Sequence, residues 1–552
     1  MKSEIDKLLK KTRWFTVITT LCLVVVSLLA VTGCEKEELR NIQVMDKETL
    51  NQTLSAKETE GKSVTIQTLG AWAASCAEEW ITFDTAQGDE AGTYTIAIHL
   101  LPNITGLDRK ATITIVCNGT RLAVSIMQQA NNEDGSIPKS MTIRSNNGFE
   151  NIGLIGSGEV TIIVDDDISS SRMFDLSASP IDFRSTGNML SIIGENIHKL
   201  VCPGGSLTYL DVSNNPALTE LFCQANQLTT LIVSNTALTD LICFRNQLTE
   251  LDVSNNTALE NLDCEANQLT SLDVSNNTAL KTLACANNQI TSLDVRDRTD
   301  LLMLSCYNNQ LSELDISNNS VLTFLNCMAN HFTELDVSNN TELESLYCSY
   351  NPLKYLNISN NTSLTTLHCY ENELTELDIS HNLALTTLAC RDNQLTELEV
   401  RNHTALTELA CDGNLLKNLD ISKNLELTSL NISRNQLTEL DIKNHVKLLQ
   451  LSCYDNSIAE LDVSANPLLI NLDCQNNQLF ELDVSNNKSL QRINCKYNNM
   501  SSSALNNLFH SLNSLDWVNP LILIYGNPGA SDDDLDITIA TNKGWIVDTD
   551  MP

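Results

Sequence analysis

The residues best able to do chemistry are the 18 cysteines. Fourteen of them, from Cys202 to Cys495, follow one another at steps of 21 residues, except for one step of 20 and one of 42. Thiolates could ligate a metal or form disulfides. A straight ladder gathers no tetrahedral set of ligands, and its Cβ atoms, about 4.8 Å apart, fall outside the range of roughly 3.5–4.5 Å that a disulfide needs. Ile432 fills the position that the doubled step skips, so the pattern predicts buried free thiols in a slot for small apolar groups.

The cysteines mark the turns of an internal repeat. Each turn reads L-x-x-L-x-C-x-x-N-x-L-x-x-L-D-V-S-x-N-x-x, as in the turn that contains Cys264, Asn267 and Asp273. One turn cannot bury its own leucines, so fifteen turns must stack, into a rod or arc of roughly 70 Å. Asparagines from Asn226 to Asn498 share one column, where an amide can bond the backbone of adjacent turns.

This pattern resembles the leucine-rich-repeat superfamily across residues 197–499. Its nesting of two similar L-x-x-L-x-(C/V)-x-x-N halves resembles the short bacterial class called IRREKO repeats. The resemblance implies a mostly β repeat solenoid whose strands form the concave face. The fold class that we expect is therefore a leucine-rich-repeat solenoid, preceded by an all-β immunoglobulin-like sandwich.

Aromatic side chains gather beside the cysteine column in four consecutive turns. They are Tyr307, Phe324, Tyr347, His368 and Tyr370, with Met328 and Tyr350 nearby. Exposed rings in a group indicate an interaction site, and tyrosine suits both protein and sugar ligands. The alternative is that ring-on-ring ladders merely stabilise the parallel sheet.

A second outward column carries acidic residues in the recurring Glu-Leu-Asp-Val/Ile-Ser segment. Its aspartates are Asp252, Asp273, Asp294, Asp315, Asp336, Asp378, Asp420, Asp441, Asp462 and Asp483. Hard cations such as Ca²⁺ favour oxygen ligands, so they could sit between some carboxylates. A solvated face with hydrogen bonds to serine and asparagine is the interpretation that we favour, so no metal is assigned. The net charge of -35 disfavours nucleic acid as a partner.

The first 33 residues read as a lipoprotein signal peptide. A basic start precedes the apolar run 15–30, which ends in Val31-Thr32-Gly33-Cys34, and this tetrapeptide resembles the bacterial lipobox. Acylation of Cys34 would anchor the chain by lipid alone. The segment 34–44 is then a tether, and its residues 35–38 resemble the export signal of Bacteroidetes surface lipoproteins. The expected location is the outer membrane, exposed at the cell surface.

Residues 45–130 show short alternating strands, which favour a β-sandwich. The segment resembles the BACON family through Trp72, the turn at Trp80, Arg109 and a closing Gln128, and the family name implies carbohydrate binding. We interpret both tryptophans as core anchors rather than sugar platforms, and a spacer role is equally plausible. The sequence leaves open whether Cys76 and Cys117 pair. A linker over 131–140 and a β-rich N-terminal cap over 141–196 follow.

The last segment, 500–552, breaks the repeat and is expected to cap the solenoid, beginning with a short helix over 501–512. The sequence contains no nucleophile elbow, P-loop, H-E-x-x-H or dinucleotide fingerprint, so we expect no catalytic residue and no cofactor. The leading function is a cell-surface adhesin-like protein that binds a protein ligand. A glycan-binding accessory lipoprotein and a structural spacer are the alternatives.

Overall fold

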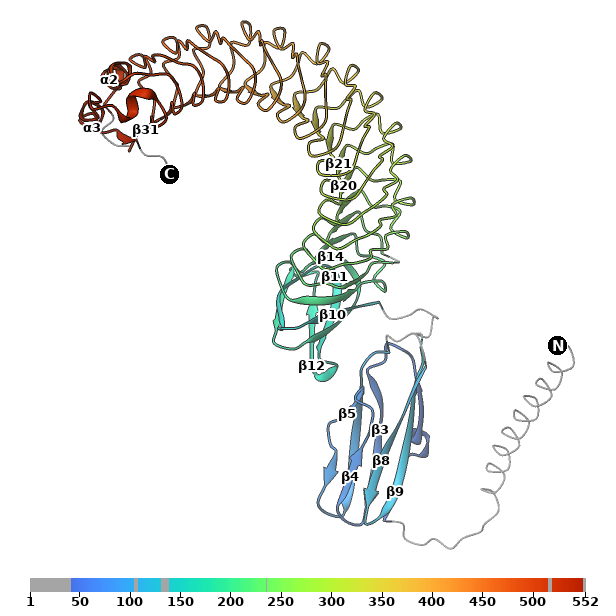
Figure 1. Ribbon diagram of the computed structural model, residues 1–552. Helices are drawn as coiled ribbons and strands as arrows, with labels where there is room; N and C mark the ends of the chain where they lie inside the picture. Colours follow the sequence, from blue (N-terminus) through green and yellow to red (C-terminus); the bar gives the residue numbers. More distant parts are fainter. Residues whose placement is uncertain (1–40, 104–107, 131–138, 235, 515–518, 550–552) are drawn as a thin grey trace, which may run out of the picture. The chain divides into compact units, whose positions relative to one another are not determined.

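The computed structural model describes residues 41–549 except for 104–107, 131–138, 235 and 515–518. The chain is mostly β and divides into two compact units between residues 137 and 138, each of which is described by itself below (Figure 1). The signal segment and Cys34 lie outside the described residues. Within the described ranges, none of the helices has the length and apolar character that crossing a membrane requires.

The first unit is a sandwich of two β-sheets that bury one hydrophobic core between them. One sheet runs in the order β1 (Ile42–Val44), β3 (Glu60–Thr68), β7 (Gly92–Leu100) and β5 (Ile81–Phe83). The other runs β2 (Asn51–Leu54), β9 (Thr120–Gln128), β8 (Arg109–Cys117), β4 (Trp72–Ser75) and β6 (Gln87–Gly88), and the short helix η1 (Lys47–Leu50) precedes β2. Alternating buried and exposed positions along β3, β7, β8 and β9 explain why these segments form strands.

Both tryptophans of the sandwich pack against its core, the position that the sequence predicts for them. Trp72 is buried in the core, where its ring centroid lies 5.2 Å from that of Tyr94. Trp80 packs on the edge of the same core, and the guanidinium of Arg109 lies 4.2 Å from its ring centroid. Cys76 and Cys117 are free thiols, which answers the question that the sequence left open.

The second unit begins with an antiparallel sheet, and the last strand of that sheet continues as the first strand of the solenoid. Its strands are β10 (Ser140–Ser145), β11 (Phe149–Val164), β12 (Asp167–Asp175), β13 (Ile181–Ser185) and β14 (Met189–Val201). The first part of β14 pairs antiparallel with β10, while its last three residues pair in parallel with β16 (Glu220–Phe222). One strand therefore joins the cap to the repeats without a break in the sheet.

Each turn of the solenoid contributes one short parallel strand, and these strands line the inner side of the arc of the second unit (Figure 1). After β16 they are β18 (Asp240–Ile242), β19 (Asn261–Asp263), β20 (Thr282–Ala284), β21 (Met303–Ser305), β22 (Phe324–Asn326), β23 (Ser345–Tyr347), β24 (Thr366–His368), β25 (Thr387–Ala389), β26 (Glu408–Ala410), β27 (Ser429–Asn431), β28 (Gln450–Ser452), β29 (Asn471–Asp473) and β30 (Arg492–Asn494). β15 (Leu207–Asp211) and β17 (Thr230–Ile232) pair on the opposite half-turn. The central leucine of a strand points inward and its two neighbours point outward, so the outward positions are free to vary.

The fourteen repeat cysteines are buried free thiols, as the pattern predicts. Burial raises the pKa of the Cys306 thiol to about 12. Two residues after the cysteine, the backbone turns through the left-handed region, with φ values such as 51° at Ala329 and 55° at Tyr350. This turn bends the chain out of the strand and brings the next asparagine under the preceding carbonyls.

The asparagine that follows the left-handed turn uses both ends of its amide, and we call this column the first asparagine ladder. The Nδ2 of Asn330 donates to the carbonyls of Cys306 at 3.0 Å and Cys327 at 3.2 Å. Its Oδ1 accepts from the amide of Leu311 at 2.9 Å. The column runs from Asn226 to Asn498, so the expected role of these amides is confirmed.

A second asparagine ladder lies on the opposite half-turn and uses only the donor end of its amide. The Nδ2 of Asn340 donates to the carbonyls of Ile316 at 3.0 Å and Asn319 at 2.9 Å. The Oδ1 atoms of this column are buried and have no hydrogen-bond partner in the described part of the chain. Its asparagines are Asn215, Asn256, Asn277, Asn319, Asn340, Asn361, Asn382, Asn424, Asn466 and Asn487, and the same positions are filled by Thr236, Arg298, His403 and His445 in other turns.

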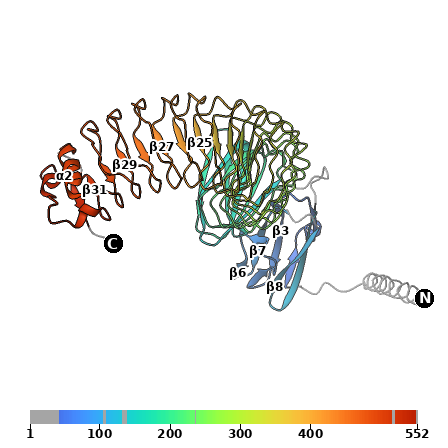
Figure 2. The same cartoon turned by 45° about the horizontal axis from the view of Figure 1, so that its top comes forward.

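The sheet continues past residue 499, where the sequence pattern ends. β31 (Leu521–Leu523) pairs in parallel with β30, and β32 (Ile546–Asp548) pairs with β31. Asn527 continues the first ladder, since its Nδ2 donates to the carbonyls of Cys495 and Ile524. The segment expected to be only a cap thus adds further turns, in which α2 (Ser502–Ser511), η2 (Pro528–Ser531) and α3 (Thr538–Thr541) replace the usual loop (Figure 2).

Candidate ligand-binding surface

The outward positions beside the strands form the surface that we call the strand face. It comprises the first and third residues of each strand, the residue after the cysteine, and the left-handed residue that follows. The first ladder and the leucines hold the backbone beneath it rigidly, while its own side chains differ from turn to turn. The repeated leucines and asparagines therefore fix the position and orientation of the strand face, and the residues that vary from turn to turn determine which chemical groups it presents.

Four of the five predicted site residues come together on this face, and Tyr350 joins them. The rings of Phe324 and Tyr347 lie 5.5 Å apart between centroids, and those of Tyr347 and His368 lie 4.8 Å apart. Tyr370 lies 6.0 Å from His368 and 5.2 Å from Tyr350, whose side chain is 46% exposed. We call these five residues the aromatic cluster. Its rings meet edge to face or tilted, the geometry that aromatic pairs prefer.

Tyr307, the fifth predicted site residue, lies apart from the aromatic cluster. Its hydroxyl donates to a carboxylate oxygen of Glu265 at 2.6 Å and accepts from the side-chain Nδ2 of Asn287 at 2.8 Å. Burial, followed by the bond to Glu265, raises the pKa of Tyr307. Tyr307 matches the other predicted site residues in being aromatic and in lying beside the cysteine column. Its hydroxyl, however, belongs to a hydrogen-bond network that links three turns.

Sequence reasoning missed Arg391, which extends the aromatic cluster by one turn. Its guanidinium carbon lies 4.3 Å from the ring centroid of Tyr370, a cation–π contact. Burial, together with a smaller effect from Arg391, lowers the pKa of His368 below its usual value, although Glu408 opposes the shift. The imidazole is therefore neutral at pH 7. The guanidinium of Arg391 is the positive charge that this part of the surface offers.

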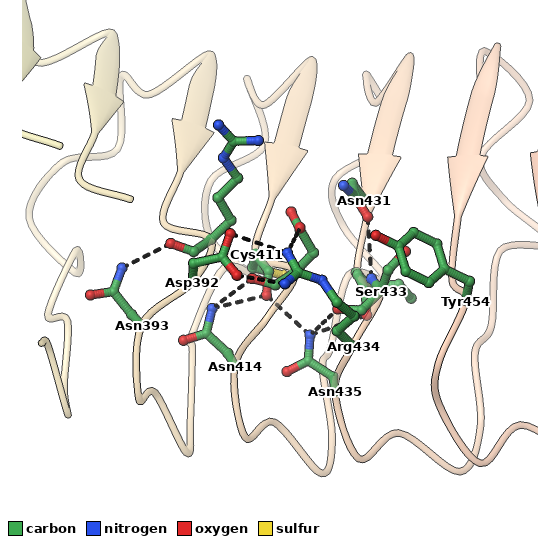
Figure 3. Close-up of polar contacts among 12 residues, drawn as sticks. Asp392, Asn393, Cys411, Asn414, Asn431, Ser433, Arg434, Asn435 and Tyr454 are labelled. Atoms are coloured by element: carbon green, nitrogen blue, oxygen red, sulfur yellow. Dashed lines mark hydrogen bonds and ion pairs between the residues drawn. The ribbon is translucent and has the colours of Figure 1, made fainter. Parts of the chain in front are cut away.

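Arg434 makes a further polar arrangement on the strand face that the sequence did not reveal. Figure 3 shows Arg434 reaching back over the intervening turn to Asp392, above the ladder residues Asn393, Asn414 and Asn435. Its Nη1 lies 2.7 Å from a carboxylate oxygen of Asp392, and its Nη2 lies 2.8 Å from Asp412. The available signal was Gly413, a glycine at a left-handed position that other turns fill with larger residues.

The aspartates in the column on the opposite half-turn accept hydrogen bonds from backbone amides. Asp336 accepts from the amide of Ser338 at 2.9 Å, and Asp273 accepts in the same way from Ser275 at 2.8 Å. Hydrogen bonds from Ser338 hold the pKa of Asp336 below its usual value. In the ranges that the structure describes, no three metal-ligating side chains converge. These contacts match the favoured interpretation, a solvated face bonded to serines.

Comparison with protein families places the sandwich. Residues 70–129 match the family model described as "BACON: Putative binding domain, N-terminal". The match spans β4 to β9 and confirms the resemblance that the sequence suggested. A comparison with curated protein sequences gives no match.

Two solved structures resemble the solenoid. One is described as "Functional domain of InlJ from Listeria monocytogenes includes a cysteine ladder"; it is 36% identical, with 62% of this chain and 77% of that chain covered, at a TM-score of 0.57. The other is a leucine-rich-repeat protein of Leptospira interrogans, 24% identical over 61% of this chain and 91% of that chain, at a TM-score of 0.53. The second likeness concerns the fold alone. Both confirm the repeat fold, and the first likeness extends to a structure whose description names a cysteine ladder.

Proposed function

The chain belongs to the leucine-rich-repeat family with a cysteine ladder, and from this premise we propose that it is a non-catalytic binding protein whose strand face takes a protein ligand. The observation that carries the proposal is the aromatic cluster with Arg391 beside it. Tyrosine and arginine are the side chains that dominate the energetics of protein interfaces. A rigid sheet presents them without the entropic cost of ordering loops.

The hydroxyls of the cluster support binding over a purely structural role. Some tyrosine hydroxyls elsewhere in the described residues bond within the protein, as Tyr94 does to the carbonyl of Glu90 and Tyr307 does to Glu265. Among the described residues, the hydroxyls of Tyr347, Tyr350 and Tyr370 have no such partner. They remain open to a ligand, while ring stacking alone would be served equally by phenylalanine.

We propose further that Cys34 is acylated and holds the chain at the outer membrane, exposed to the outside. The lipobox-like tetrapeptide supports this location. The test is acyl labelling of the full chain and of Cys34→Ala, followed by protease treatment of intact cells. Labelling that Cys34→Ala abolishes, together with cleavage from outside, is the expected result. Labelling that survives the substitution would refute acylation at Cys34, and protection from protease would refute exposure.

The binding proposal is tested by presenting the chain from residue 35 onward to a panel of extracellular-matrix proteins and to a glycan array. The Tyr347→Ala, Tyr370→Ala double variant is compared with a matched control, Tyr355→Ala, Phe480→Ala. The control rings are 57% and 64% exposed and lie on the opposite half-turn. A protein ligand lost in the first variant and kept in the second is expected. A ligand retained by the first variant would remove the aromatic cluster from the account.

A glycan is the second candidate, since tyrosine rings also stack on sugars and the chain carries a domain of the BACON family. Its signature on the same array would be binding to a sugar class that the Tyr347, Tyr370 variant loses. If sugar binding survives in this variant and the sandwich itself binds the sugar, the function would instead lie on the first unit.

A further inference from the structure

The strand face between Phe324 and Arg434 carries two guanidinium groups with opposite surroundings. Arg434 is paired with two carboxylates, at 2.7 Å and 2.8 Å. Arg391 has no carboxylate within ion-pair distance among the described residues, and its guanidinium lies over Tyr370. In a chain with a net charge of -35, an unpaired cation over a half-buried ring requires an explanation.

Arg434 contributes to the isolation of Arg391, because it pairs with two strand-face carboxylates, those of Asp392 and Asp412. Asp392 is the next residue after Arg391, and Asp412 holds the position after the cysteine in the following turn. Asp412 is only 3% exposed, so its charge is turned into the protein toward Arg434. The same guanidinium thereby neutralises Asp392 and Asp412, while the carboxylates of Glu371 and Glu408 are exposed to solvent.

Gly413 makes this arrangement possible. It lies in the turn between Asp392 and Arg434, with φ at +65°. A Cβ atom at this position would lie 2.3 Å from the Oδ1 of Asp392 and 3.1 Å from the Nη2 of Arg434. Other turns accept asparagine, glutamate or tyrosine at the same left-handed position. Only glycine leaves the room that the side chain of Arg434 needs to cross the turn.

From this geometry we infer that the ligand of the strand face is an extended peptide segment that presents a carboxylate to Arg391 and an apolar side chain to the aromatic cluster. The inference rests on the proposed function and names the ligand class. A guanidinium held against a ring keeps its donor fork available for a carboxylate. Alternate side chains of an extended peptide lie about 6.5–7 Å apart, while successive turns lie about 4.8 Å apart. When an acidic residue of the peptide contacts Arg391, the peptide residue two positions away thus lies over His368 and Tyr347.

The test uses a display library of random twelve-residue peptides, selected on the chain from residue 35 onward. Selection is repeated with Arg391→Met, which keeps most of the apolar stem, and with Arg401→Met as the matched control. Arg401 lies on the opposite half-turn and pairs with Asp420 at 3.1 Å. The expected peptides carry aspartate or glutamate close to an aromatic or aliphatic residue. Their acidic bias should disappear with Arg391→Met and persist with Arg401→Met.

Affinities of one selected peptide then test the arrangement around Gly413. Replacing its acidic residue by the amide, or Arg391 by methionine, should weaken binding about tenfold or more, as expected for a lost charge-assisted bond. Arg434→Met should also weaken binding, although Arg434 does not touch the peptide, because it frees Asp392 and Asp412 to oppose the ligand. Thermal melting of each variant shows that the fold is kept.

The outcomes separate this inference from the proposed function. Peptides without acidic bias that fail to bind the Tyr347→Ala, Tyr370→Ala double variant would overturn the inference and leave the strand face as the binding site. Acidic bias that persists in Arg391→Met would likewise overturn it. Failure of the unmodified chain to enrich any peptide would count against both.

Discussion

The two asparagine ladders perform similar work with different chemistry, and the difference explains which positions of the solenoid can change. In the first ladder, Asn330 donates to two carbonyls and accepts from Leu311, so both ends of the amide are used. In the second, Asn340 donates to two carbonyls while its oxygen is buried without a partner. A side chain that supplies only a donor can therefore replace asparagine in the second ladder and not in the first.

The chain itself bears out this distinction. From Asn226 to Asn498 the first ladder is asparagine in every turn. The second ladder contains His403 and His445, whose Nε2 atoms lie 2.9 Å and 3.1 Å from the carbonyls that asparagine would reach. Arg298, also in this column, bonds to the carbonyl of Val274. The requirement in this column is a donor, whichever side chain carries it.

Histidine exchanges in the two ladders give the largest expected contrast. Asn330→His leaves the buried amide of Leu311 without an acceptor, which costs about 1–3 kcal/mol, and adds volume that costs about 1–3 kcal/mol more. Asn340→His should change the free energy of unfolding by less than about 1 kcal/mol, because its donor role is retained. Denaturant unfolding measures the two values, and hydrogen exchange at Leu311 reports the local effect. Equal losses would contradict the distinction.

The cysteine column offers a second contrast, between a polar and an apolar replacement of similar size. Cys327→Ser places a hydroxyl in an apolar column, at a cost of about 1–3 kcal/mol. Cys327→Val should cost less, since Ile432 already fills the same slot in a later turn. Thermal melting of the two variants is the measurement. A serine variant as stable as the valine variant would refute the apolar character of the slot.

The aspartate column gives the smallest expected effect and a dependence on pH. Hydrogen bonds lower the pKa of Asp336, so this carboxylate stabilises the fold above the unfolded value of about 3.9 and loses that contribution as pH falls through its folded pKa. Asn357 fills the same position and accepts from the amide of Ser359 at 3.1 Å. Asp336→Asn should therefore keep stability at pH 7 within about 0.5 kcal/mol.

The measurement is the melting temperature of both proteins between pH 7 and pH 2. Because asparagine does not titrate, the variant should lose less stability than the parent on acidification. An identical loss in both would mean that Asp336 makes no contribution that depends on its charge. Melting in excess chelator and in added calcium, performed on the same samples, tests the cation hypothesis, for which no shift is expected.

The solenoid could be predicted from the sequence because the same residue types recur at a fixed spacing at the inward-facing positions. Each turn buries the same positions, so the spacing is visible in the sequence. The positions of Leu304, Cys306 and Asn309 recur from turn to turn, with isoleucine in place of cysteine at Ile432, and the structure places them as expected. The last turns were missed because α2 interrupts the period before β31 and Asn527 resume it. Helical and loop insertions of this kind leave the sheet intact and erase the spacing.

The candidate site was only partly predictable, because its contacts depend on side-chain direction between turns. Ring type and column found the aromatic cluster but could not separate Tyr307, whose hydroxyl reaches Glu265 two turns earlier. In the sequence, nothing distinguishes Arg391 from other residues at variable positions, and only its contact with the ring of Tyr370 assigns it to the site. The role of Gly413 depends on Arg434 reaching Asp392, which no spacing rule encodes.

The most direct test of the central claim, that the strand face binds while the opposite half-turn supports it, is oxidative footprinting of the chain with and without its captured ligand. Hydroxyl radicals modify exposed rings on both surfaces, so each molecule contains its own control. The account predicts that Tyr350 becomes protected on binding while Tyr355 and Phe480 keep their reactivity. Protection of Tyr355 and Phe480, with Tyr350 unchanged, would contradict it.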